Sequence, residues 1–541
     1  MLTAKEVTRY RAGQVVLDRV SLSVGPQSRI GVVGPNGIGK STLLRVLAGV
    51  ERPDSGSVER SPASLQVGYL TQEPDAGPGE TLRAYLSRRT GVAASEAELN
   101  RLTAALAGDA DQVDAYSEAL DRFLALGGDD FDARAATVCA ELGLPADRLD
   151  VAVSELSGGQ GARAGLAAIV LSRFDVFLLD EPTNDLDFAG LDRLEGFLAG
   201  LPGAVVVVSH DRAFLDRGVD RILEIEEASH TAREYAGGWS EYVERRALAR
   251  SQQEEGYRRY VEEKSRLADR VRTQRSWSEQ GVRAVKKRPR DHDKAQRGFF
   301  VNRTEKQASK VRASERKLSQ LETVDKPWEG WRLQLDLAPA ERSGDIVARL
   351  EEAVVTRGSF TLGPVDLEVR WRDRIAVLGP NGGGKTTLLR AMLGQLPLTS
   401  GRSYLGPGVV VGDVDQRRVG LSGEASVLDA VMAGTGLPRE EARSLLAKFG
   451  LGAEHVFRPA GRLSPGERTR AILATMMGQG VNCLVLDEPT NHLDLAAIEQ
   501  LEEALDRFEG TVLLVSHDRW LLDEVRLDRT LTVTDGQVTE S

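Results

Sequence analysis

A glycine-rich segment that could bind phosphate occurs twice in this chain of 541 residues, at 34–41 (GPNGIGKS) and 379–386 (GPNGGGKT). In such a loop, backbone N–H groups converge on phosphate oxygens at the start of a helix, whose dipole favours anions. The lysine adds positive charge, and the hydroxyl after it can ligate Mg²⁺. The predicted phosphate-binding residues are Gly34, Asn36, Gly37, Gly39, Lys40, Ser41 and Thr42, and then Gly379, Asn381, Gly382, Gly384, Lys385, Thr386 and Thr387.

An Asp-Glu pair ends each of two apolar segments, at 180–181 and 487–488. The aspartate is predicted to hold the shell of a Mg²⁺ ion, and the glutamate to orient and polarise the attacking water. A buried Asp-Glu pair without a cation would cost free energy, which disfavours a purely structural role. The predicted Mg²⁺ ligands are Ser41, Gln72, Asp180, Thr386, Gln416 and Asp487, and the water-polarising residues are Glu181 and Glu488. Gln72 and Gln416 are also counted among the ATP-binding residues.

A histidine follows each of two further apolar segments, as His210 and His517. A lone histidine at the end of a strand is usually structural. Two histidines in the same register of a repeat instead predict a sensor that can hydrogen-bond a γ-phosphate oxygen. We count both as catalytic candidates.

These landmarks define a tandem duplication. The two glycine loops are 345 residues apart and the two glutamines 344, whereas the serines at 157 and 464, the aspartates and the histidines are each 307 apart. The first copy therefore holds about 37 more residues between Gln72 and Ser157. Leucines at helical spacing between 93 and 126 predict an inserted helical arm at about 75–125. The alternative is a longer helical subdomain without a partner.

The elements around the glycine loops fit a phosphate site. Residues 20–24 and 365–369 alternate between apolar and polar, as half-buried antiparallel strands do. Continuous apolar segments at 30–33 and 375–378 then lead directly into the two loops, and an apolar helix pattern follows at 43–47. A strand, a glycine loop and a helix in this order are the context that a phosphate loop requires.

The composition is that of a globular protein, with 41% hydrophobic and 28% charged residues and a net charge of −11. The two cysteines, Cys139 and Cys483, are interpreted as reduced core thiols of a cytoplasmic protein. No signal peptide and no apolar run of membrane-spanning length is visible, so we expect no membrane contact and no permease in the chain. The histidines and cysteines lack the spacing of a zinc or haem site.

A basic segment separates the two copies. Residues 272–317 hold fifteen basic and five acidic side chains, although the whole chain is acidic. Residues 239–328 are predicted to form two antiparallel helices with a basic tip at about 281–300 that could bind RNA phosphates. The predicted RNA-binding residues are Arg283, Lys286, Lys287, Arg288, Arg290, Lys294 and Arg297. The alternative is a solvated, charge-rich coiled coil without a ligand.

Residues 156–160 (LSGGQ) and 463–467 (LSPGE), each with its serine 23 residues before the aspartate, resemble the signature motif of the ATP-binding cassette superfamily. The segments NDLD (184–187) and NHLD (491–494) resemble its D-loop. The resemblance implies a head-to-tail sandwich in which the lysine, aspartate and glutamate of one cassette face the signature of the other across ATP. It adds as ATP-binding residues Ser157, Gly158, Gly159, Gln160, Ser464, Gly466 and Glu467.

The resemblance also assigns Tyr10 to adenine stacking. In the second cassette Phe360 is the nearest aromatic residue. Pro465 replaces a signature glycine and removes one backbone N–H. Because both glutamates are present, we expect two competent but unequal ATP sites.

Tandem cassettes, no membrane span and a long charged linker together resemble the ABC-F family. The implied fold is α/β, with two P-loop ATPase domains at 1–238 and 329–541 joined by an antiparallel helical hairpin. The implied cofactors are ATP and Mg²⁺, in a monomer whose cassettes form the sandwich. The implied partner is the ribosome, with the linker tip near the P-site tRNA and peptidyl-transferase centre and the arm on the rRNA of the large subunit.

Two subgroups of that family remain open: antibiotic resistance by ribosome protection, and a translation factor that relieves stalled or paused ribosomes. Because the sequence ends soon after the second cassette, we expect it to lack the C-terminal coiled coil that some relatives add. A competing class is the ATPase subunit of a drug exporter or sugar importer with a separate permease, in which a basic hairpin has no evident role. DNA-maintenance cassette ATPases form a third class, but they insert zinc modules or longer coiled coils.

Overall fold

The computed structural model describes residues 1–71, 76–106, 112–156, 158–184, 186–287, 316, 342–413, 421, 423–491 and 493–541. Side chains are described in these ranges except at 71, 146, 158, 159, 162, 274–287 and 465. The chain divides into two compact units, one made of Met1–Ser240 with Trp331–Ser541 and the other of Glu241–Gly330. The first unit holds two cassettes of the same architecture, and the second holds a single long helix among its described residues.

Each cassette begins with a three-stranded antiparallel sheet. In the first, the order is β2-β1-β4, and in the second it is β11-β10-β13. The alternation at 20–24 and 365–369 is confirmed, because Val20, Leu22 and Val24 are buried on one face while the residues between them are exposed. The strands are β1 (Leu2–Arg11), β2 (Gln14–Val24), β4 (Ser55–Arg60), β10 (Ile346–Arg357), β11 (Phe360–Arg370) and β13 (Ser400–Leu405).

A six-stranded sheet forms the centre of each cassette, with the order β5-β6-β7-β3-β8-β9 in the first and β14-β15-β16-β12-β17-β18 in the second. All neighbouring strands are parallel except the last pair of each sheet. In the first cassette the strands are β3 (Arg29–Val33), β5 (Val67–Thr71), β6 (Val176–Asp180), β7 (Ala204–Val208), β8 (Arg221–Ile225) and β9 (Ala232–Ala236). In the second they are β12 (Arg374–Leu378), β14 (Val411–Asp413), β15 (Cys483–Asp487), β16 (Thr511–Val515), β17 (Arg529–Thr534) and β18 (Gln537–Glu540).

The helix after each glycine loop is enclosed between the two sheets of its cassette. Leu43, Leu44 and Leu47 of α1 (Lys40–Ala48) belong to one apolar core with strands of both first-cassette sheets, and α11 (Lys385–Met392) takes the same place in the second cassette. This burial fixes where the start of the helix, at the lysine, lies in the cassette. Its apolar side chains face both sheets, so its N-terminus is held at the carboxyl ends of the parallel strands, where ligands bind in such folds.

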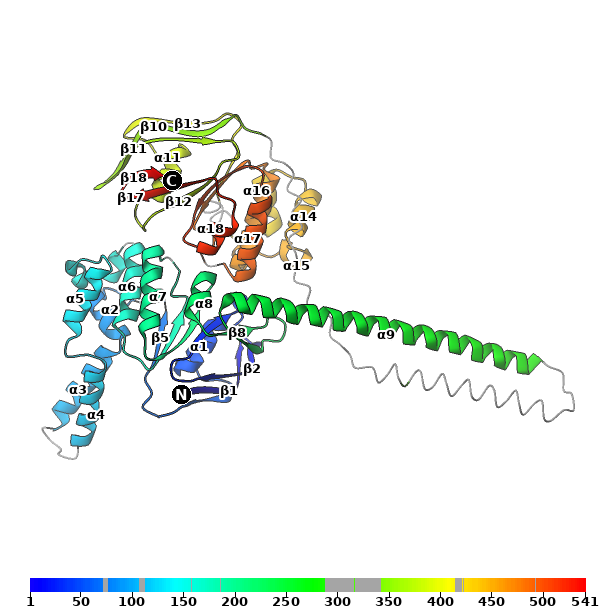
Figure 1. The fold of residues 1–541 in the computed structure, drawn as a ribbon, viewed down its shortest axis with the longest axis horizontal. Helices are drawn as coiled ribbons and strands as arrows, with labels where there is room; N and C mark the ends of the chain where they lie inside the picture. Colours follow the sequence, from blue (N-terminus) through cyan, green and yellow to red (C-terminus); the bar gives the residue numbers. More distant parts are fainter. Residues whose placement is uncertain are drawn as a thin grey trace. The chain divides into compact units, whose positions relative to one another are not determined.

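Further helices cover the parallel sheets and form a helical subdomain in each cassette (Figure 1). In the first cassette these are α2 (Leu82–Arg89), α5 (Phe131–Glu141), α6 (Gly158–Leu171), α7 (Phe188–Gly200) and α8 (Arg212–Gly218). In the second they are α13 (Val427–Thr435), α14 (Arg439–Lys448), α15 (Ala453–Val456), α16 (Pro465–Gly478), α17 (Leu495–Arg507) and α18 (Arg519–Glu524). Cys139 and Cys483 are both buried free thiols, and burial raises their pKa values to about 11 and about 12.

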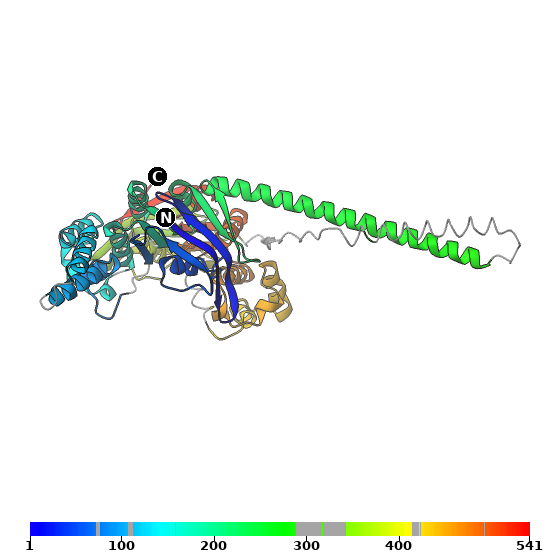
Figure 2. The same cartoon turned by 90° about the horizontal axis from the view of Figure 1, so that it is seen from below.

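The long helix α9 (Trp239–Lys287) is unbroken in both views of Figures 1 and 2. Ion pairs one turn apart support it, such as Arg250 with Glu254 at 3.1 Å. The sequence placed a tip at about 281–300, and this boundary was wrong for its first residues, since the helix continues to Lys287. Residues 281–287 are mostly helix formers, and one glycine inside a helix costs only about 1 kcal/mol relative to alanine.

The predicted RNA-binding residues divide at this helix end. Arg283, Lys286 and Lys287 lie in the last two turns of α9. Arg288, Arg290, Lys294 and Arg297 lie outside the described residues, as does the predicted return helix. Within the part of the chain that the structure describes, no helix is both long and apolar enough to cross a membrane.

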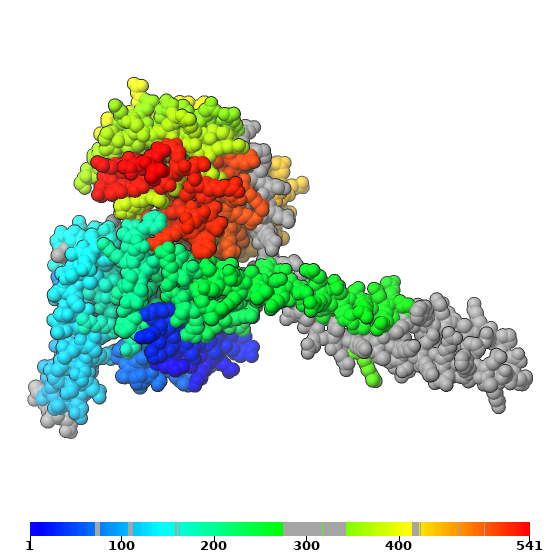
Figure 3. Space-filling view, in the orientation of Figure 1, coloured from blue at the N-terminus to red at the C-terminus, as the bar shows by residue number. Residues whose placement is uncertain are grey.

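Two helices occupy the region where the sequence predicts an arm, α3 (Val92–Leu106) and α4 (Val113–Ala125). They pack against each other and project from the first cassette next to α2 (Figures 1 and 3). Leu102 of α3 and Ala119 of α4 are buried, whereas Val113 and Leu124 are exposed. The pair is held mainly by its own thin apolar seam, and its outer faces are open to a partner.

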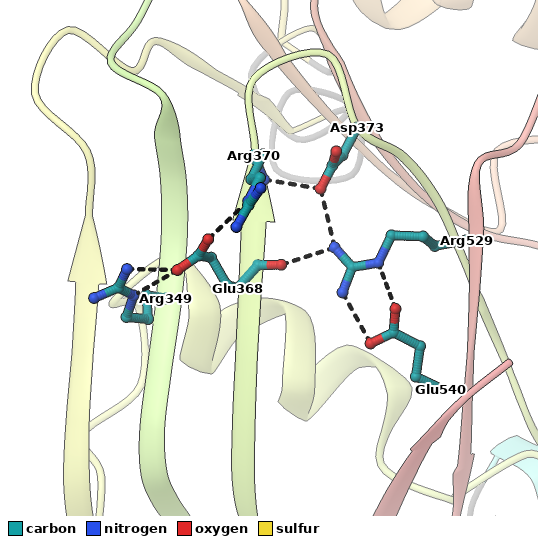
Figure 4. Close-up of polar contacts among 6 residues, drawn as sticks. All are labelled: Arg349, Glu368, Arg370, Asp373, Arg529 and Glu540. Atoms are coloured by element: carbon teal, nitrogen blue, oxygen red, sulfur yellow. Dashed lines mark hydrogen bonds and ion pairs between the residues drawn. The ribbon is translucent and has the colours of Figure 1, made fainter.

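A chain of polar contacts ties the two sheets of the second cassette together (Figure 4). Glu368 of β11 accepts hydrogen bonds from Arg349 of β10 and from Arg370. Arg529 of β17 donates to the backbone oxygen of Glu368 at 2.8 Å, to Asp373 at 3.0 Å and to Glu540 of β18 at 2.6 Å. Because one guanidinium reaches both sheets, it fixes their mutual position around α11.

The two cassettes contact each other through a reciprocal pair of arginines in equivalent positions. Arg212 at the start of α8 makes a two-armed ion pair with Glu502 of α17. Arg519 at the start of α18 pairs with Glu195 of α7 at 2.8 Å. The two are unequal, since the Arg212 side chain is 4% exposed and that of Arg519 is 19% exposed.

We expect Arg212→Ala to lower the free energy of unfolding by about 3 kcal/mol, because it leaves Glu502 buried without its partner. Thermal and denaturant unfolding of the full chain measure this loss. Arg519→Ala is the matched control and should cost less, about 1 kcal/mol, since that guanidinium keeps contact with water. Equal losses, or no recovery in Arg212→Glu combined with Glu502→Arg, would contradict this account of the contact.

The buried carboxylate beside this contact predicts a pH effect. Burial, with Asp518 nearby, raises the pKa of Asp211 to about 6, although Asp211 also caps α8 by accepting from Phe214 N at 2.9 Å. A raised pKa means that ionisation disfavours the folded state, so stability falls as the pH rises from the unfolded pKa through about 6. Asp211→Asn keeps the cap. It should therefore stabilise the chain by up to about 3 kcal/mol at about pH 8 and by nothing at about pH 3, where the carboxyl is neutral in both states. A gain that is the same at both pH values would rule out this cause.

Candidate ATP sites

The two glycine loops have the same backbone path. Gly39 and Gly384, the residues before α1 and α11, adopt left-handed conformations with φ of 116° and 111°. A Cβ on Gly39 would also lie 2.6 Å from the Val16 side chain. Glycine is therefore required there, and the loop can turn its N–H groups toward a phosphate at the helix start. The other predicted loop residues, Gly34, Asn36, Gly37, Gly379, Asn381 and Gly382, lie in the same two turns.

The loop lysines point back into their own loops. Lys40 Nζ donates to Gly34 O at 2.7 Å and Lys385 Nζ to Gly379 O at 2.8 Å. Burial lowers the pKa of both lysines. Nearby carboxylates raise it, and the largest of these effects comes from Glu181 on Lys40 and from Glu488 on Lys385. Each ammonium is thus a buried positive charge that holds the loop closed and is available to phosphate oxygens. Thr42 is buried behind Lys40, and Thr387 is half-buried behind Thr386.

A hydroxyl and a carboxylate meet in each site. Ser41 Oγ lies 3.0 Å from Asp180 Oδ1, and Thr386 Oγ1 lies 2.7 Å from Asp487 Oδ2. Mg²⁺ prefers such oxygen ligands and is usually held by one or two carboxylates together with substrate phosphates. The pairs therefore fit the ion that this kind of loop requires. Among the described residues there is no cluster of three His, Cys, Asp or Glu side chains that would suggest a different metal.

The glutamate after each aspartate has unusual backbone geometry. Glu181 and Glu488 have φ of 51° and 47°, a conformation that side chains rarely adopt. Their N–H groups donate to Val208 O and Val515 O, both at 2.9 Å, which holds the strained turn in place. Strain of this kind gathers at functional sites. It directs the two carboxylates into the sites.

The two histidines lie against these glutamates. His210 Nε2 is 3.1 Å from Glu181 Oε1, and His517 Nε2 is 3.4 Å from Glu488 Oε1. Burial raises the pKa of Glu181 to about 7, and neither Glu181 Oε2 nor either ring nitrogen of His210 has a hydrogen-bond partner in the described residues. A buried carboxylate oxygen and imidazole without partners can hold a water and a phosphate oxygen.

The contacts of the second histidine, His517, show which of its ring nitrogens carries the proton. Lys385 Nζ lies 3.0 Å from His517 Nε2, and an ammonium can only donate. Nε2 therefore accepts, and the ring proton lies on Nδ1. Burial, with Lys385, lowers the pKa of His517 to about 4, and burial lowers that of His210 well below its usual value, so both rings are neutral.

The described signature residues lie at helix starts. Ser464 caps α16 by accepting from Glu467 N at 3.2 Å, and Ser464 N donates to the Glu467 carboxylate at 2.8 Å. Pro465 takes the first position of this helix, where the missing N–H has no intrahelical partner to lose. The N–H that Pro465 removes from the signature motif is therefore no loss to the hydrogen bonds of the helix. Gly466 follows it, Gly158, Gly159 and Gln160 begin α6, and Ser157 lies outside the described residues.

Each glycine loop also bonds a carboxylate of the other cassette. Asn36 N donates to Asp494 Oδ2 at 3.1 Å, and Asn381 N donates to Asp187 Oδ2 at 3.0 Å. The other oxygen of each aspartate caps the helix that follows it, α17 or α7. A cavity of about 450 Å³ beside this contact is lined from both cassettes, by His210 and Asn184 among others from the first and by Glu488 and His517 from the second.

The two cassettes differ at the position of Tyr10, the predicted adenine-stacking residue. Tyr10 pairs with Val15 one position before the end of the β1–β2 hairpin, and it is 49% exposed. The equivalent pair in the β10–β11 hairpin is Thr356 with Thr361, so Thr356 replaces Tyr10. Phe360 is not the counterpart, and its ring packs beneath Gly384, where a Cβ would lie 2.7 Å from it. The second site thus has no aromatic residue at the register of Tyr10.

Some site residues could not be placed and others were missed. Gln72 and Gln416 lie outside the described residues. The sequence reading named the segments that hold Asp187 and Asp494 but assigned the two aspartates no role. Their capping pattern, an aspartate before a helix in both copies, is the signal that could have identified them. Tyr69, whose hydroxyl donates to Asp180 Oδ2 at 2.8 Å, carried no such signal.

The family model described as "ABC transporter" matches residues 17–184 and 362–491, which include both glycine loops and both Asp-Glu pairs. The chain is 35% identical to the tylosin resistance ATP-binding protein TlrC of Streptomyces fradiae, over 96% of this chain and 94% of that protein. It is 33% identical to the energy-dependent translational throttle protein EttA of Mycobacterium tuberculosis, over 96% and 89%. It is 31% identical to ABC transporter F family member 5 of Arabidopsis thaliana, over 98% and 75%.

Solved structures share the fold at lower identity. An archaeal ribosome recycling factor, aABCE1, crystallised with the ribosomal stalk protein aP1, aligns with a TM-score of 0.57 at 20% identity, over 98% of this chain and 89% of that chain. RNase-L Inhibitor aligns with a TM-score of 0.56, also at 20% identity, over 99% and 90%. From the duplicated cassettes, their reciprocal loop contacts and these full-length relatives, the chain is an ATP-hydrolysing enzyme that belongs to the ABC-F family of tandem ATP-binding cassette proteins.

Proposed function

We propose that this ABC-F ATPase binds the ribosome in its ATP-bound state and protects it from a large-subunit antibiotic. The observation that carries the proposal is the likeness to a tylosin resistance protein over nearly the full length of both chains. The throttle protein EttA matches over a similar length at 33% identity, so a translation factor for paused ribosomes is the second candidate. Both candidates place the protein in the cytoplasm, on rRNA and tRNA rather than with a permease.

In the proposed ATP cycle, the loop N–H groups and Lys40 or Lys385 bind the phosphates. Ser41 with Asp180, or Thr386 with Asp487, holds Mg²⁺, which neutralises charge on the transferring phosphate. Glu181 or Glu488 orients and polarises the water, and the neutral histidine beside it donates to or accepts from the γ-phosphate region. The signature residues of the opposite cassette complete each site, so ATP draws the cassettes together and hydrolysis lets them separate.

The linker is proposed as the element that contacts RNA. Helix α9 has 49 residues, which at 1.5 Å per residue is a rise of about 70 Å. Three of the predicted RNA-binding cations, Arg283, Lys286 and Lys287, lie in its last two turns, and four more follow in the sequence. Clustered cations that neutralise phosphates make binding strongly dependent on salt. We propose that this end meets the P-site tRNA and the peptidyl-transferase centre, and that α3 and α4 meet rRNA of the large subunit.

The test of the cycle is the chain carrying Glu181→Gln with Glu488→Gln. Without the polarising carboxylates, ATP stays bound, so we expect this variant to co-sediment with ribosomes in ATP and to be released when ATP is omitted. The wild-type chain should be found on ribosomes at a much lower level. Sedimentation of the variant free of ribosomes with ATP present, or its recovery with membranes, would contradict the proposal.

A susceptibility panel separates the two candidates. Cells that express the wild-type chain should tolerate more tylosin and related large-subunit drugs, whereas drugs of the small subunit should act unchanged. Expression of the double glutamine variant should give no protection, because it cannot leave the ribosome. Altered growth or elongation without any drug tolerance would favour the translation-factor candidate.

Neutralising Lys286, Lys287, Arg288 and Arg290 to glutamine should reduce ribosome binding about tenfold or more at physiological salt and flatten its salt dependence. Basal ATPase should change less than twofold, because these residues are not part of either ATP site. The matched control neutralises four cations in the middle of the same helix, Arg258, Arg259, Lys264 and Arg266. If the control variant loses as much binding as the first, the effect is one of total charge and the end of α9 has no special role.

A further inference from the structure

The carboxylate that is proposed to hold Mg²⁺ in the first site has a second hydrogen-bond donor. Asp180 Oδ1 faces Ser41 Oγ at 3.0 Å, and Asp180 Oδ2 accepts from Tyr69 Oη at 2.8 Å. Tyr69 lies on β5, the strand next to β6, and pairs with Leu178 two residues before the aspartate. The carboxylate is therefore held from both sides, with one oxygen toward the hydroxyl of the glycine-loop helix.

The phenol also lies next to a series of charged side chains that extends to β1 of the antiparallel sheet. Arg45 of α1 is near enough to Tyr69 for its charge to affect the phenol, and it donates to Glu51 at 2.6 Å. Glu51 also accepts from Arg11 at 2.9 Å, on the strand that carries Tyr10. Burial and the Asp180 charge raise the pKa of Tyr69 above its usual value, so the phenol keeps its proton and remains a donor.

The second cassette lacks the tyrosine and the glutamate of this row of contacts. β14 pairs with β15 as β5 pairs with β6, and the residue opposite Val485, two before Asp487, is Asp413. An acidic residue thus replaces Tyr69. The counterpart of Arg45 is Arg390, which is exposed, and the counterpart of Glu51 in the repeat is Leu396. The row of contacts through Tyr69 is therefore a feature of the first cassette alone.

We propose that Tyr69 is a positioning residue of the first ATP site, whose hydroxyl fixes the Asp180 carboxylate beside Ser41 to receive Mg²⁺. Hydrogen bonds to a metal-binding carboxylate orient it, and their loss weakens metal affinity about 10- to 100-fold. The second site has no tyrosine at this register and instead carries a carboxylate, Asp413, on the neighbouring strand. The two sites then differ in how far nucleotide binding depends on Mg²⁺. This proposal concerns the ATP site and does not depend on the ribosome being the partner.

The test measures binding of a non-hydrolysable ATP analogue to the full chain carrying Lys385→Ala, so that bound nucleotide reports the first site. Affinity is compared in saturating Mg²⁺ and in EDTA, and the ratio gives the gain due to the metal. We expect Tyr69→Phe to lower this ratio about tenfold and to leave the affinity in EDTA within about twofold. An unchanged ratio, or an equal fall in both affinities, would overturn the proposal, because a merely structural role would not single out Mg²⁺.

Two matched controls use the same chemistry. Tyr235 on β9 is buried and its hydroxyl also bonds a carboxylate, Glu224, so Tyr235→Phe removes an equivalent bond away from the site and should leave the ratio unchanged. Tyr69→Phe in a chain carrying Lys40→Ala, where only the second site binds, should also leave it unchanged. Arg45→Gln, which removes the positive charge beside the phenol, should lower the ratio by a smaller factor. A drop in either control would contradict the assignment to the first site.

Discussion

The reciprocal hydrogen bonds between the glycine loops and the aspartates of the opposite cassettes are the contacts on which the rest of the arrangement depends. Asn36 N meets Asp494, and Asn381 N meets Asp187, at nearly equal distances. Each aspartate also caps its own helix, so a movement of either loop is passed to α17 or α7 through a single carboxylate. The arginine pairs nearby, Arg212 with Glu502 and Arg519 with Glu195, hold the same two surfaces together independently of nucleotide. A chain built in this way can convert the state of a phosphate site into the relation between its cassettes.

The two sites share a plan but differ in detail, and each difference has a physical cause. His517 accepts from Lys385, whereas His210 faces the glutamate without that lysine contact. Thr356 stands where the first hairpin carries Tyr10, so a nucleotide base has an aromatic surface at only one of these two positions. Tyr69 holds Asp180, and its counterpart is an acid. The two sites are therefore unequal, and they are expected to bind and hydrolyse ATP at different rates.

Much of this could be predicted from sequence because the chemistry repeats. The glycine loops, the Asp-Glu pairs and the histidines lie next to strands whose apolar runs are readable, and the structure has those strands where they were predicted. The partner of Tyr69 was not predictable, because a hydrogen bond across 111 residues follows from register between strands and not from local pattern. The predicted start of the basic tip, at about residue 281, was wrong for a simpler reason. Gly281 was read as a turn, but helix formers on both sides outweigh the cost of one glycine. The sequence offered only a nearest aromatic residue, Phe360, for the second cassette, because the counterpart of Tyr10 is defined by hairpin register, which selects Thr356.

The central claim is that ATP in the two cassettes directs the basic end of α9 to the ribosome. The most direct measurement is a cryo-electron microscopy structure of the Glu181→Gln, Glu488→Gln chain with ATP and ribosomes. The account predicts two bound nucleotides between closed cassettes, with the region after Lys287 against the P-site tRNA near the peptidyl-transferase centre. A complex in which that region contacts no RNA, or ribosomes that carry no bound chain although both sites hold ATP, would contradict it.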